Sequence, residues 1–186
     1  SDWRSAPAGE LIVSSKESVP LAEYVLHEKA IVQDFLVQDP RMAEFSPSSV
    51  NTLRLVTMLT SQSQVIIVYS VFRSGVGKAI VDNFSAGGVL VDVDCDRGVL
   101  RKYAYDKNSN RYASHPTSGI AFEGHPVPAW PRVRAFAEDF QRSFPFYRMI
   151  GLDIALDGEG DPVIIEANGQ PDLGGYEQAV GPLLKN

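Results

Sequence analysis

Residues 151–175 read GLDIALDGEGDPVIIEANGQPDLGG, in which two apolar runs flank a turn-forming DGEGD segment. This pattern predicts a β-hairpin. If the turn is centred within DGEGD, the numbers of paired residues sum to about 319, which places Asp153 opposite Glu166. Because strand side chains alternate between two faces, Asn168 lies on the same face as Glu166. The hairpin is therefore expected to present two carboxylates and an amide on one face.

The other face of this hairpin is expected to be apolar and to contribute to a core. The same register assigns to that face Leu152, Ile154, Leu156, Val163 and Ile165. Antiparallel strands commonly bury one face and expose the other to water. The acidic face by itself is therefore also consistent with a solvated surface.

The two opposed carboxylates require something that offsets their repulsion. Like charges directly opposite each other destabilise a strand pair, and neighbouring carboxylates push one of the two pKa values up. A hard divalent cation removes both effects, because carboxylate and amide oxygens are ligands that Mg²⁺ and Mn²⁺ prefer. Besides the solvated face, a carboxylate pair for general acid–base catalysis, as in glycoside hydrolysis, is a further alternative.

The composition is that of an ordinary soluble globular protein. The chain has 186 residues, 44% of them apolar and 22% charged, and a formal net charge of −6. No run of Lys or Arg supplies the basic surface that nucleic-acid binding needs, and no apolar run reaches the roughly 18 residues of a membrane span. The first residues do not form a secretory signal pattern. We therefore expect no nucleic acid and no membrane as partners, and a cytoplasmic location.

The single cysteine, Cys95, excludes an internal disulfide and a zinc site built of several thiolates. It lies in DVDCDRG, residues 92–98, whose acidic side chains raise a thiol pKa, so we expect a structural cysteine and no nucleophile. The alternating aspartates resemble the start of a calcium loop, but the glycine comes one position late and Tyr103 stands at the twelfth position instead of Glu. DVDCDRG is therefore expected to be a hairpin turn.

The remaining patterns predict an α+β chain with a mostly antiparallel sheet. Strands are expected at residues 10–14 and 31–36, and as two hairpins that join 51–60 to 64–73 and 89–94 to 99–106. Helices are expected at 18–30, with Ser18 as cap and Pro20 in the first turn, at 131–144, and at 176–186. In the second helix the apolar stripe consists of Val133, Phe136, Ala137 and Phe140.

Three connecting segments are expected to be loops, at residues 37–49, 74–88 and 108–131. The third is long for a structureless connection inside a compact domain, so we expect it to be functional or packed by its own side chains. It contains His115 and His125, each followed by Pro. For both histidines, a neutral loop residue and a substrate contact are open interpretations.

The final hairpin resembles the last catalytic hairpin of the ATP-grasp superfamily, where an Asp on one strand and a Glu-x-Asn on the next hold the magnesium ions of ATP. Taken in order, SVNTLRLVTML, VDNFSAGG, SHPTSG, EGHPVPAW and this hairpin resemble the sugar-transfer-associated ATP-grasp family. VDNFSAGG and the hairpin are also similar to the glutamate-ligase branch. The resemblance extends from Glu10 to Gln178. It implies an ATP-grasp-like fold, with ATP and Mg²⁺ or Mn²⁺ as cofactors.

The resemblance also implies roles for individual residues. The implied metal ligands are Asp153, Glu166 and Asn168. The residues implied to face the triphosphate or an acyl phosphate are Arg54 and Arg73, because a guanidinium group binds phosphate through two hydrogen bonds. For either arginine a surface ion pair is the alternative. The implied nucleotide contacts are Gln33, Phe35 and Leu36 at adenine, Asp39 at ribose, and Asn83 at the phosphates, where Gly87 and Gly88 permit close backbone approach.

The resemblance further implies that part of the full ATP-grasp fold is missing. Residues 1–40 correspond to a remnant of the small lobe, and residues 41–186 to the C-terminal catalytic lobe. The family's strand with a phosphate-binding Lys-Pro has no counterpart here, and Lys16 does not replace it. We therefore expect a fragment or a naturally shortened protein that is inactive alone and binds ATP weakly, since the missing lysines remove charge-assisted contacts.

The implied activity is that of an ATP- and Mg²⁺-dependent ligase. A carboxylate is activated as an acyl phosphate and then attacked by an amine or another nucleophile, in sugar or polysaccharide metabolism. The expected partners are a nucleotide and a small-molecule carboxylate. The alternatives are a non-catalytic nucleotide-binding, metabolite-binding or interaction module, and an ATP-grasp-type kinase that phosphorylates a hydroxyl group.

Overall fold

The computed structural model describes residues 10–14, 17–20, 36–77 and 87–173, and the chain divides into two units, Ser1–Val37 and Gln38–Asn186. In the first unit, β1 (Glu10–Ser14) and β2 (Glu17–Pro20) form an antiparallel hairpin. The predicted strand at 10–14 is confirmed. The predicted helix start is wrong, because Ser18 and Pro20 pair with β1 in extended conformation. The rest of that helix and the strand predicted from residue 31 to 35 lie outside the described residues.

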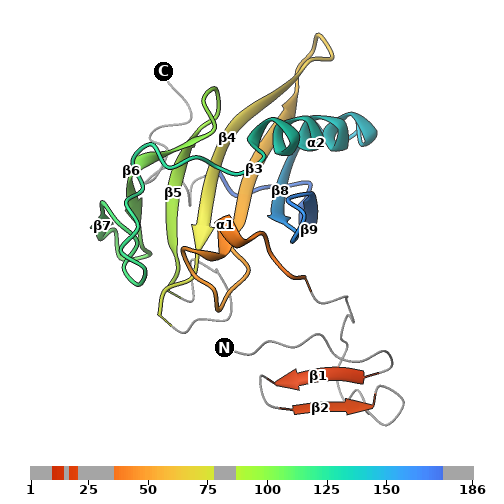
Figure 1. The fold of residues 1–186 in the computed structure, drawn as a ribbon. Helices are drawn as coiled ribbons and strands as arrows, with labels where there is room; N and C mark the ends of the chain where they lie inside the picture. Colours follow the sequence, from red (N-terminus) through yellow and green to blue (C-terminus); the bar gives the residue numbers. More distant parts are fainter. Residues whose placement is uncertain (1–9, 15–16, 21–35, 78–86, 174–186) are drawn as a thin grey trace. The chain divides into compact units, whose positions relative to one another are not determined.

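The second unit contains a seven-stranded sheet with the strand order β7-β6-β5-β4-β3-β8-β9, in which every neighbouring pair is antiparallel (Figure 1). Its strands are β3 (Thr52–Leu59), β4 (Val65–Ser74), β5 (Val89–Asp94), β6 (Val99–Tyr105), β7 (Arg111–Tyr112), β8 (Met149–Leu156) and β9 (Pro162–Asn168). Both predicted central hairpins, β3 with β4 and β5 with β6, are confirmed. The α+β class with an antiparallel sheet is confirmed as well.

A long helix covers one face of this sheet. α2 (Trp130–Ser143) contacts β3, β4, β8 and β9, and Figure 1 shows it across β3 and β8. In its predicted apolar stripe, Val133 and Ala137 are fully buried, and Phe136 and Phe140 pack against the core from its edge. Neither helix in the described part of the chain has the length and apolar character of a membrane span.

A second, short helix occupies part of a segment predicted to be a loop. α1 (Pro40–Ala43) follows Asp39, whose carboxylate accepts the backbone N–H of Arg41 at 2.8 Å. A side-chain acceptor before the first turn and a proline at its start both favour a helix. The loop prediction for 37–49 is therefore wrong for Pro40–Ala43, which form one helical turn.

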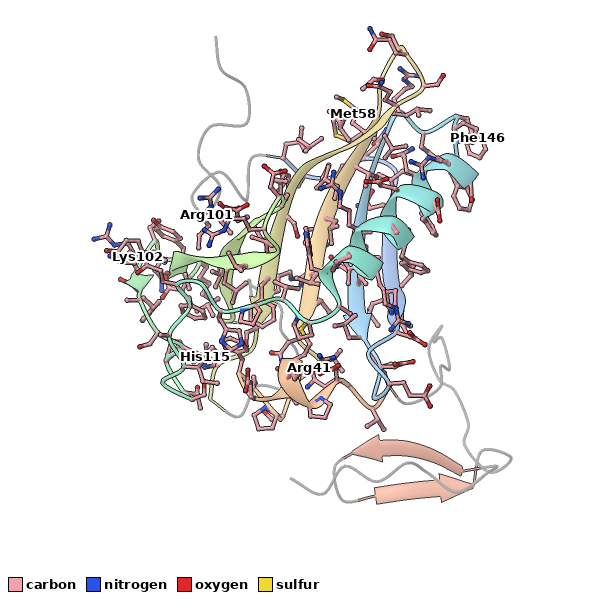
Figure 2. The ribbon with its side chains drawn as sticks, turned by 45° about the horizontal axis from the view of Figure 1, so that its top comes forward. Arg41, Met58, Arg101, Lys102, His115 and Phe146 are labelled. Atoms are coloured by element: carbon pink, nitrogen blue, oxygen red, sulfur yellow. The ribbon has the colours of Figure 1, made fainter. Side chains whose placement is uncertain are left out.

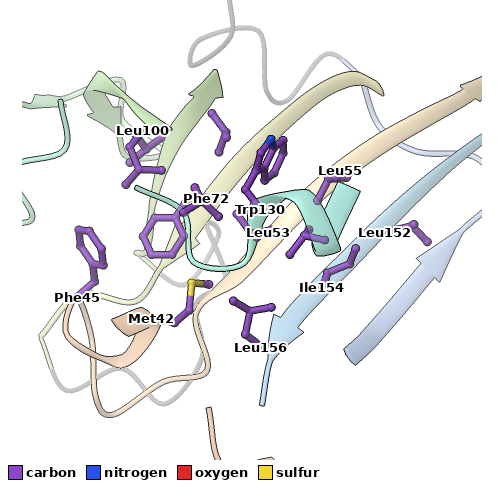
Figure 3. Close-up of a cluster of buried hydrophobic side chains, with 14 of the residues drawn as sticks. Met42, Phe45, Leu53, Leu55, Phe72, Leu100, Trp130, Leu152, Ile154 and Leu156 are labelled. Atoms are coloured by element: carbon purple, nitrogen blue, oxygen red, sulfur yellow. The ribbon is translucent and has the colours of Figure 1, made fainter. Parts of the chain in front are cut away.

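The core lies between the sheet and α2 and extends to Met42 of α1 and to Phe45, which Figure 3 shows among the buried side chains. Alternate residues of the central strands supply it, including Leu53 and Leu55 of β3 and Leu152 and Ile154 of β8, none of which has exposed surface. Because strand side chains alternate, the residues between them point to the sheet face opposite α2. That opposite face carries the polar cluster described below.

The final hairpin keeps its predicted register at the Asp153–Glu166 pair. Beyond that pair a β-bulge adds one residue to β9, which reverses the alternation towards the turn. Ile164 therefore packs against the core, and Ile165 is 44% exposed. The assignment of Val163 and Ile165 to the apolar face is wrong for this reason. The assignment is confirmed for the three fully buried residues of β8, which are Leu152, Ile154 and Leu156.

The turn between β5 and β6 packs against the start of α2. Asp94 accepts backbone N–H groups within the turn, as expected for a hairpin turn, and the indole N–H of Trp130 donates to the Cys95 carbonyl at 3.0 Å. Gly98 has a φ of +66°, and a Cβ there would lie 2.4 Å from the Trp130 ring, so this position requires glycine. Burial, with a smaller contribution from Asp92, raises the pKa of the Cys95 thiol to about 11. This supports the structural interpretation of the cysteine.

Candidate functional site

Five of the residues proposed for metal and phosphate lie on the sheet face opposite α2. Strand pairing places Arg54 of β3 opposite Asp153 of β8, and Asp153 opposite Glu166 of β9. Asn168 follows Glu166 by two residues on the same face. On β4, Arg73 lies two residues beyond the residue that pairs with Arg54. The two arginines therefore lie on the same face of the sheet. Four neighbouring strands thus bring these side chains together.

Asp153 is held by both arginines. The Arg54 Nε donates to Oδ1, and the Arg54 Nη2 donates to Oδ2 at 2.6 Å. The Arg73 Nη1 donates to the same Oδ2 at 2.9 Å. The side chains of Arg54, Arg73 and Asp153 are only 12%, 10% and 7% exposed, so solvent screens these ion pairs little. The arginines therefore form ion pairs, as the alternative interpretation held, but these pairs are buried and do not lie on the surface.

The two guanidinium groups help to explain how the sheet tolerates opposed carboxylates. The sequence interpretation assigned the compensating charge to a metal ion, whereas the structure adds two positive side chains beside Asp153. A sequence feature pointed to them, because Arg54 interrupts the apolar run TLRLVTML of β3. A charged side chain inside a buried strand needs an oppositely charged partner.

Glu166 and Asn168 form the exposed part of the cluster. The Asn168 Oδ1 accepts the backbone N–H of Gln170 at 2.9 Å, which stabilises the turn after β9. Gly151, which pairs with Asn168, has no side chain. Along this face, the polar groups therefore change from two buried ion pairs at Asp153 to an exposed carboxylate and an exposed amide on β9.

The chain after β9 crosses this face of the sheet. Pro171 packs on Gly151, where a Cβ would lie 2.8 Å from the proline Cβ. The Tyr69 hydroxyl donates to the carbonyl of Asp172 at 3.1 Å, and Leu173 packs against a small apolar cluster on β3, β4 and β5. That cluster consists of Val56, Tyr69, Val71 and Leu90. The QPDL segment thereby bounds the polar cluster on one side.

The donor types of Asp153, Glu166 and Asn168 suit a hard divalent cation. Within the described ranges, no three His, Cys, Asp or Glu side chains gather closely enough to hold a metal ion, so the amide is needed as a ligand. Asp153 is engaged by arginines and Asn168 by the backbone of Gln170. These three residues could hold a cation once those contacts are exchanged for metal bonds.

The predicted nucleotide contacts are only partly described. Gln33, Phe35 and Asn83 lie outside the described residues, and Leu36 is half-buried in the first unit. Asp39 caps α1, and its oxygens lie 3.0 and 2.5 Å from the Arg41 guanidinium. The hydrogen bond from the Arg41 side chain holds the pKa of Asp39 below its ordinary value. The adenine and ribose roles stay predictions.

An acidic pair lies farther along the same sheet face, among the aspartates for which the sequence favoured a hairpin turn over a calcium loop. Asp92 and Asp94 alternate on β5, and the Arg101 guanidinium lies 3.4 Å from Asp92 and 3.5 Å from Asp94. Burial raises the pKa of Asp92 to about 6, and Asp94 adds to this shift while Arg101 opposes it. The alternation in VLVDVD was the signal, because it places both carboxylates on the face opposite the core.

His115 lies inside the protein and anchors two loops (Figure 2). Its Nδ1 accepts the backbone N–H groups of Thr117 at 3.3 Å and Ser118 at 3.2 Å, so the proton of the neutral ring is on Nε2. Nε2 lies 2.9 Å from the carbonyl of Gly75 and 3.1 Å from the Ser74 hydroxyl. Burial lowers the pKa of His115. These contacts favour the interpretation as a neutral loop histidine.

His125 occupies a more open position at the edge of the core. Its Nε2 lies 2.9 Å from a Glu44 carboxylate oxygen, and its ring packs edge-on against Phe45 with centroids 4.8 Å apart. The side chain is 23% exposed. In the structure, His125 therefore has two neighbours that are distant in sequence, the Phe45 ring and the Glu44 carboxylate.

Comparison with protein families supports the resemblance read from the motifs. The sequence profile of the sugar-transfer associated ATP-grasp family matches residues 12–186, which include the final hairpin and the arginines of β3 and β4. Comparisons with curated proteins and with solved structures gave no match. Proteins of the ATP-grasp type generally use ATP and Mg²⁺. The chain belongs to the sugar-transfer associated ATP-grasp family.

Proposed function

We propose that this chain carries the metal- and phosphate-binding part of an ATP-dependent ligase. The reaction proposed is activation of a small-molecule carboxylate as an acyl phosphate, followed by attack of an amine or another nucleophile, in sugar or polysaccharide metabolism. The observation that carries the proposal is the shared sheet face on which Asp153 and Glu166 are paired beside Arg54 and Arg73. Family membership supports ATP as the phosphoryl donor.

The atoms of the proposed reaction balance without a side-chain nucleophile. A carboxylate oxygen attacks the γ-phosphorus of ATP, ADP leaves, and the resulting acyl phosphate is attacked at carbon by the amine. Phosphate then leaves, and the amine nitrogen loses a proton to solvent. Mg²⁺, when bound, neutralises phosphate charge. Arg54 and Arg73 would orient the transferred phosphoryl group and stabilise the negative charge on its oxygens.

Hydroxylamine trapping tests the reaction class. The chain is incubated with MgATP, hydroxylamine and a panel of sugar acids and amino acids, and hydroxamate, ADP and phosphate are measured. Glu166→Gln removes one carboxylate from the exposed part of the cluster. It should weaken MgATP binding, a readout that needs no turnover, and abolish any carboxylate-dependent hydroxamate formation. Arg134→Gln on the opposite face, where Arg134 pairs with Glu138 on α2, is the matched control and should leave it unchanged. If Glu166→Gln binds MgATP as tightly as the wild type, the metal assignment is wrong.

A non-catalytic nucleotide- or metabolite-binding module is the second candidate. It is favoured by the hydrogen bonds that both Asp153 oxygens accept from arginines and that the Asn168 amide oxygen accepts from Gln170. Calorimetry of the chain with MgATP and MnADP separates the candidates in combination with trapping. Binding without hydroxamate formation for any carboxylate supports the module. A lasting phosphoester on a hydroxyl substrate would instead identify a kinase.

A further inference from the structure

The charged side chains around Asp153 form a set whose formal charges cancel. Arg54 and Arg73 contribute two positive charges, and Asp153 and Glu166 contribute two negative charges, on adjacent strands of one sheet face. The ion pairs at Asp153 are nearly shielded from solvent. In such surroundings an added charge interacts strongly, because the effective dielectric constant is far below that of water.

Neither a metal ion nor a phosphate chain fits this balanced set alone. A divalent cation at Asp153 needs a carboxylate oxygen, and each oxygen already accepts at least one guanidinium N–H. The cation would also stand beside two positive side chains. A phosphate chain that takes up the arginines would leave Asp153 and Glu166 opposed without compensation, a repulsive arrangement.

Both penalties vanish when the two ligands arrive together. The cation then compensates the carboxylates, and the phosphate oxygens accept the guanidinium N–H groups that Asp153 releases. Arginine binds phosphate and carboxylate with the same pair of parallel hydrogen bonds, so the exchange conserves the number of charge-assisted contacts. The exchange therefore needs no charged side chain beyond the four that already form the set.

We propose that Asp153 exchanges partners, from Arg54 and Arg73 as the structure shows them to the metal ion in the loaded site, so that metal and polyphosphate bind cooperatively. The inference rests on the proposed function and adds to it a binding order set by this chain's own ion pairs. In the arrangement that the structure shows, Asp153 acts as a positioning residue that holds both guanidinium groups on the sheet face opposite α2. By linkage, each ligand raises the affinity for the other by the same factor.

Removal of an arginine should therefore change the affinities for the two ligands in opposite directions. Removing Arg54 frees Oδ1 of Asp153 for a cation, while Arg73 still donates to Oδ2. The change also removes a nearby positive charge, so the affinity for metal alone rises. The same change removes a phosphate partner, so the affinity for polyphosphate falls. Because the loss of a positive charge by itself also favours a cation, the diagnostic result is the pair of opposite effects in one variant, together with tighter metal binding by the wild type when polyphosphate is present.

Water-proton relaxation with Mn²⁺ measures both effects on the full chain, with inorganic tripolyphosphate as the phosphate probe. For the wild type we expect weak binding of Mn²⁺ alone and binding about tenfold tighter in the presence of tripolyphosphate, within the usual range of coupling between sites. Arg54→Gln, which frees Oδ1, should strengthen binding of Mn²⁺ alone by severalfold, and Arg73→Gln, which leaves Arg54 on both oxygens, should strengthen it less. Both variants should weaken binding of Mn²⁺–tripolyphosphate. Arg134→Gln on α2 should match the wild type. Circular dichroism verifies folding of each variant.

The outcomes separate this inference from the proposed function. If Mn²⁺ alone binds the wild type as tightly as Mn²⁺–tripolyphosphate, partner exchange is overturned while the metal and phosphate site stands. This comparison needs no variant, so it holds even if an arginine variant fails to fold. Unchanged or weaker Mn²⁺ binding in both folded arginine variants also overturns the exchange. If the wild type binds neither Mn²⁺ nor Mn²⁺–tripolyphosphate, the proposed function is wrong and the inference falls with it.

Discussion

Replacing Asp153 with asparagine measures how much the buried ion pairs contribute to the stability of the sheet. The carboxylate accepts three N–H groups from Arg54 and Arg73, whereas an asparagine keeps one oxygen and turns an NH₂ group towards positive side chains. Removing one partner of a buried ion pair costs about 3–5 kcal/mol. We expect about 3 kcal/mol, because the arginines keep 12% and 10% of their side-chain surface exposed and regain some hydration. The melting temperature should fall by roughly 6–12 °C for a chain of this length.

Urea unfolding followed by circular dichroism gives the free energy of unfolding for Asp153→Asn and for a matched control. Asp139→Asn breaks an ion pair with Arg142 in which the Asp139 side chain is 77% exposed, so its cost should stay below about 1 kcal/mol. The urea dependence of the free energy should be unchanged in both variants. If the two substitutions cost the same within error, the buried ion pairs do not stabilise the sheet and the reasoning is refuted.

Four further substitutions test the packing and the titration of the fold. Gly98→Ala should destabilise by about 3 kcal/mol in urea unfolding, from its positive φ and the clash with Trp130, whereas Gly119→Ala, with positive φ and open space, should cost about 1 kcal/mol. Because burial lowers the pKa of His115, the unfolded chain binds the proton first, so the contribution of His115 to stability should fall as the pH drops below about 6.5, by at most about 1.4 kcal/mol per pH unit. His115→Gln should remove that pH-dependent loss, and an unchanged pH profile would contradict the assignment. Gly151→Ala should displace the proline that packs on it and weaken Mn²⁺–tripolyphosphate binding, with equal binding as the contrary result.

Local pattern predicted much of the sheet and helix content. Alternation and the DGEGD turn fixed the pairing of Asp153 with Glu166, because a one-residue slip would move every side chain of the strand to the other face. The periodicity of residues 131–144 predicted α2, since Val133 and Ala137 recur at helical spacing. Errors arose where local signals compete with pairing. Ser18 and Pro20 read as a helix start, yet the neighbouring strand captures them in β2.

The sequence by itself determined that two carboxylates and an amide share one face of a hairpin, because side-chain alternation is a property of any strand. Only the tertiary structure decided what surrounds Asp153. Arg54 and Arg73 lie 99 and 80 residues away in the sequence and meet it because β3 is inserted between β4 and β8. The strand order depends on how α2 and the core as a whole are buried. No local sequence pattern encodes that order.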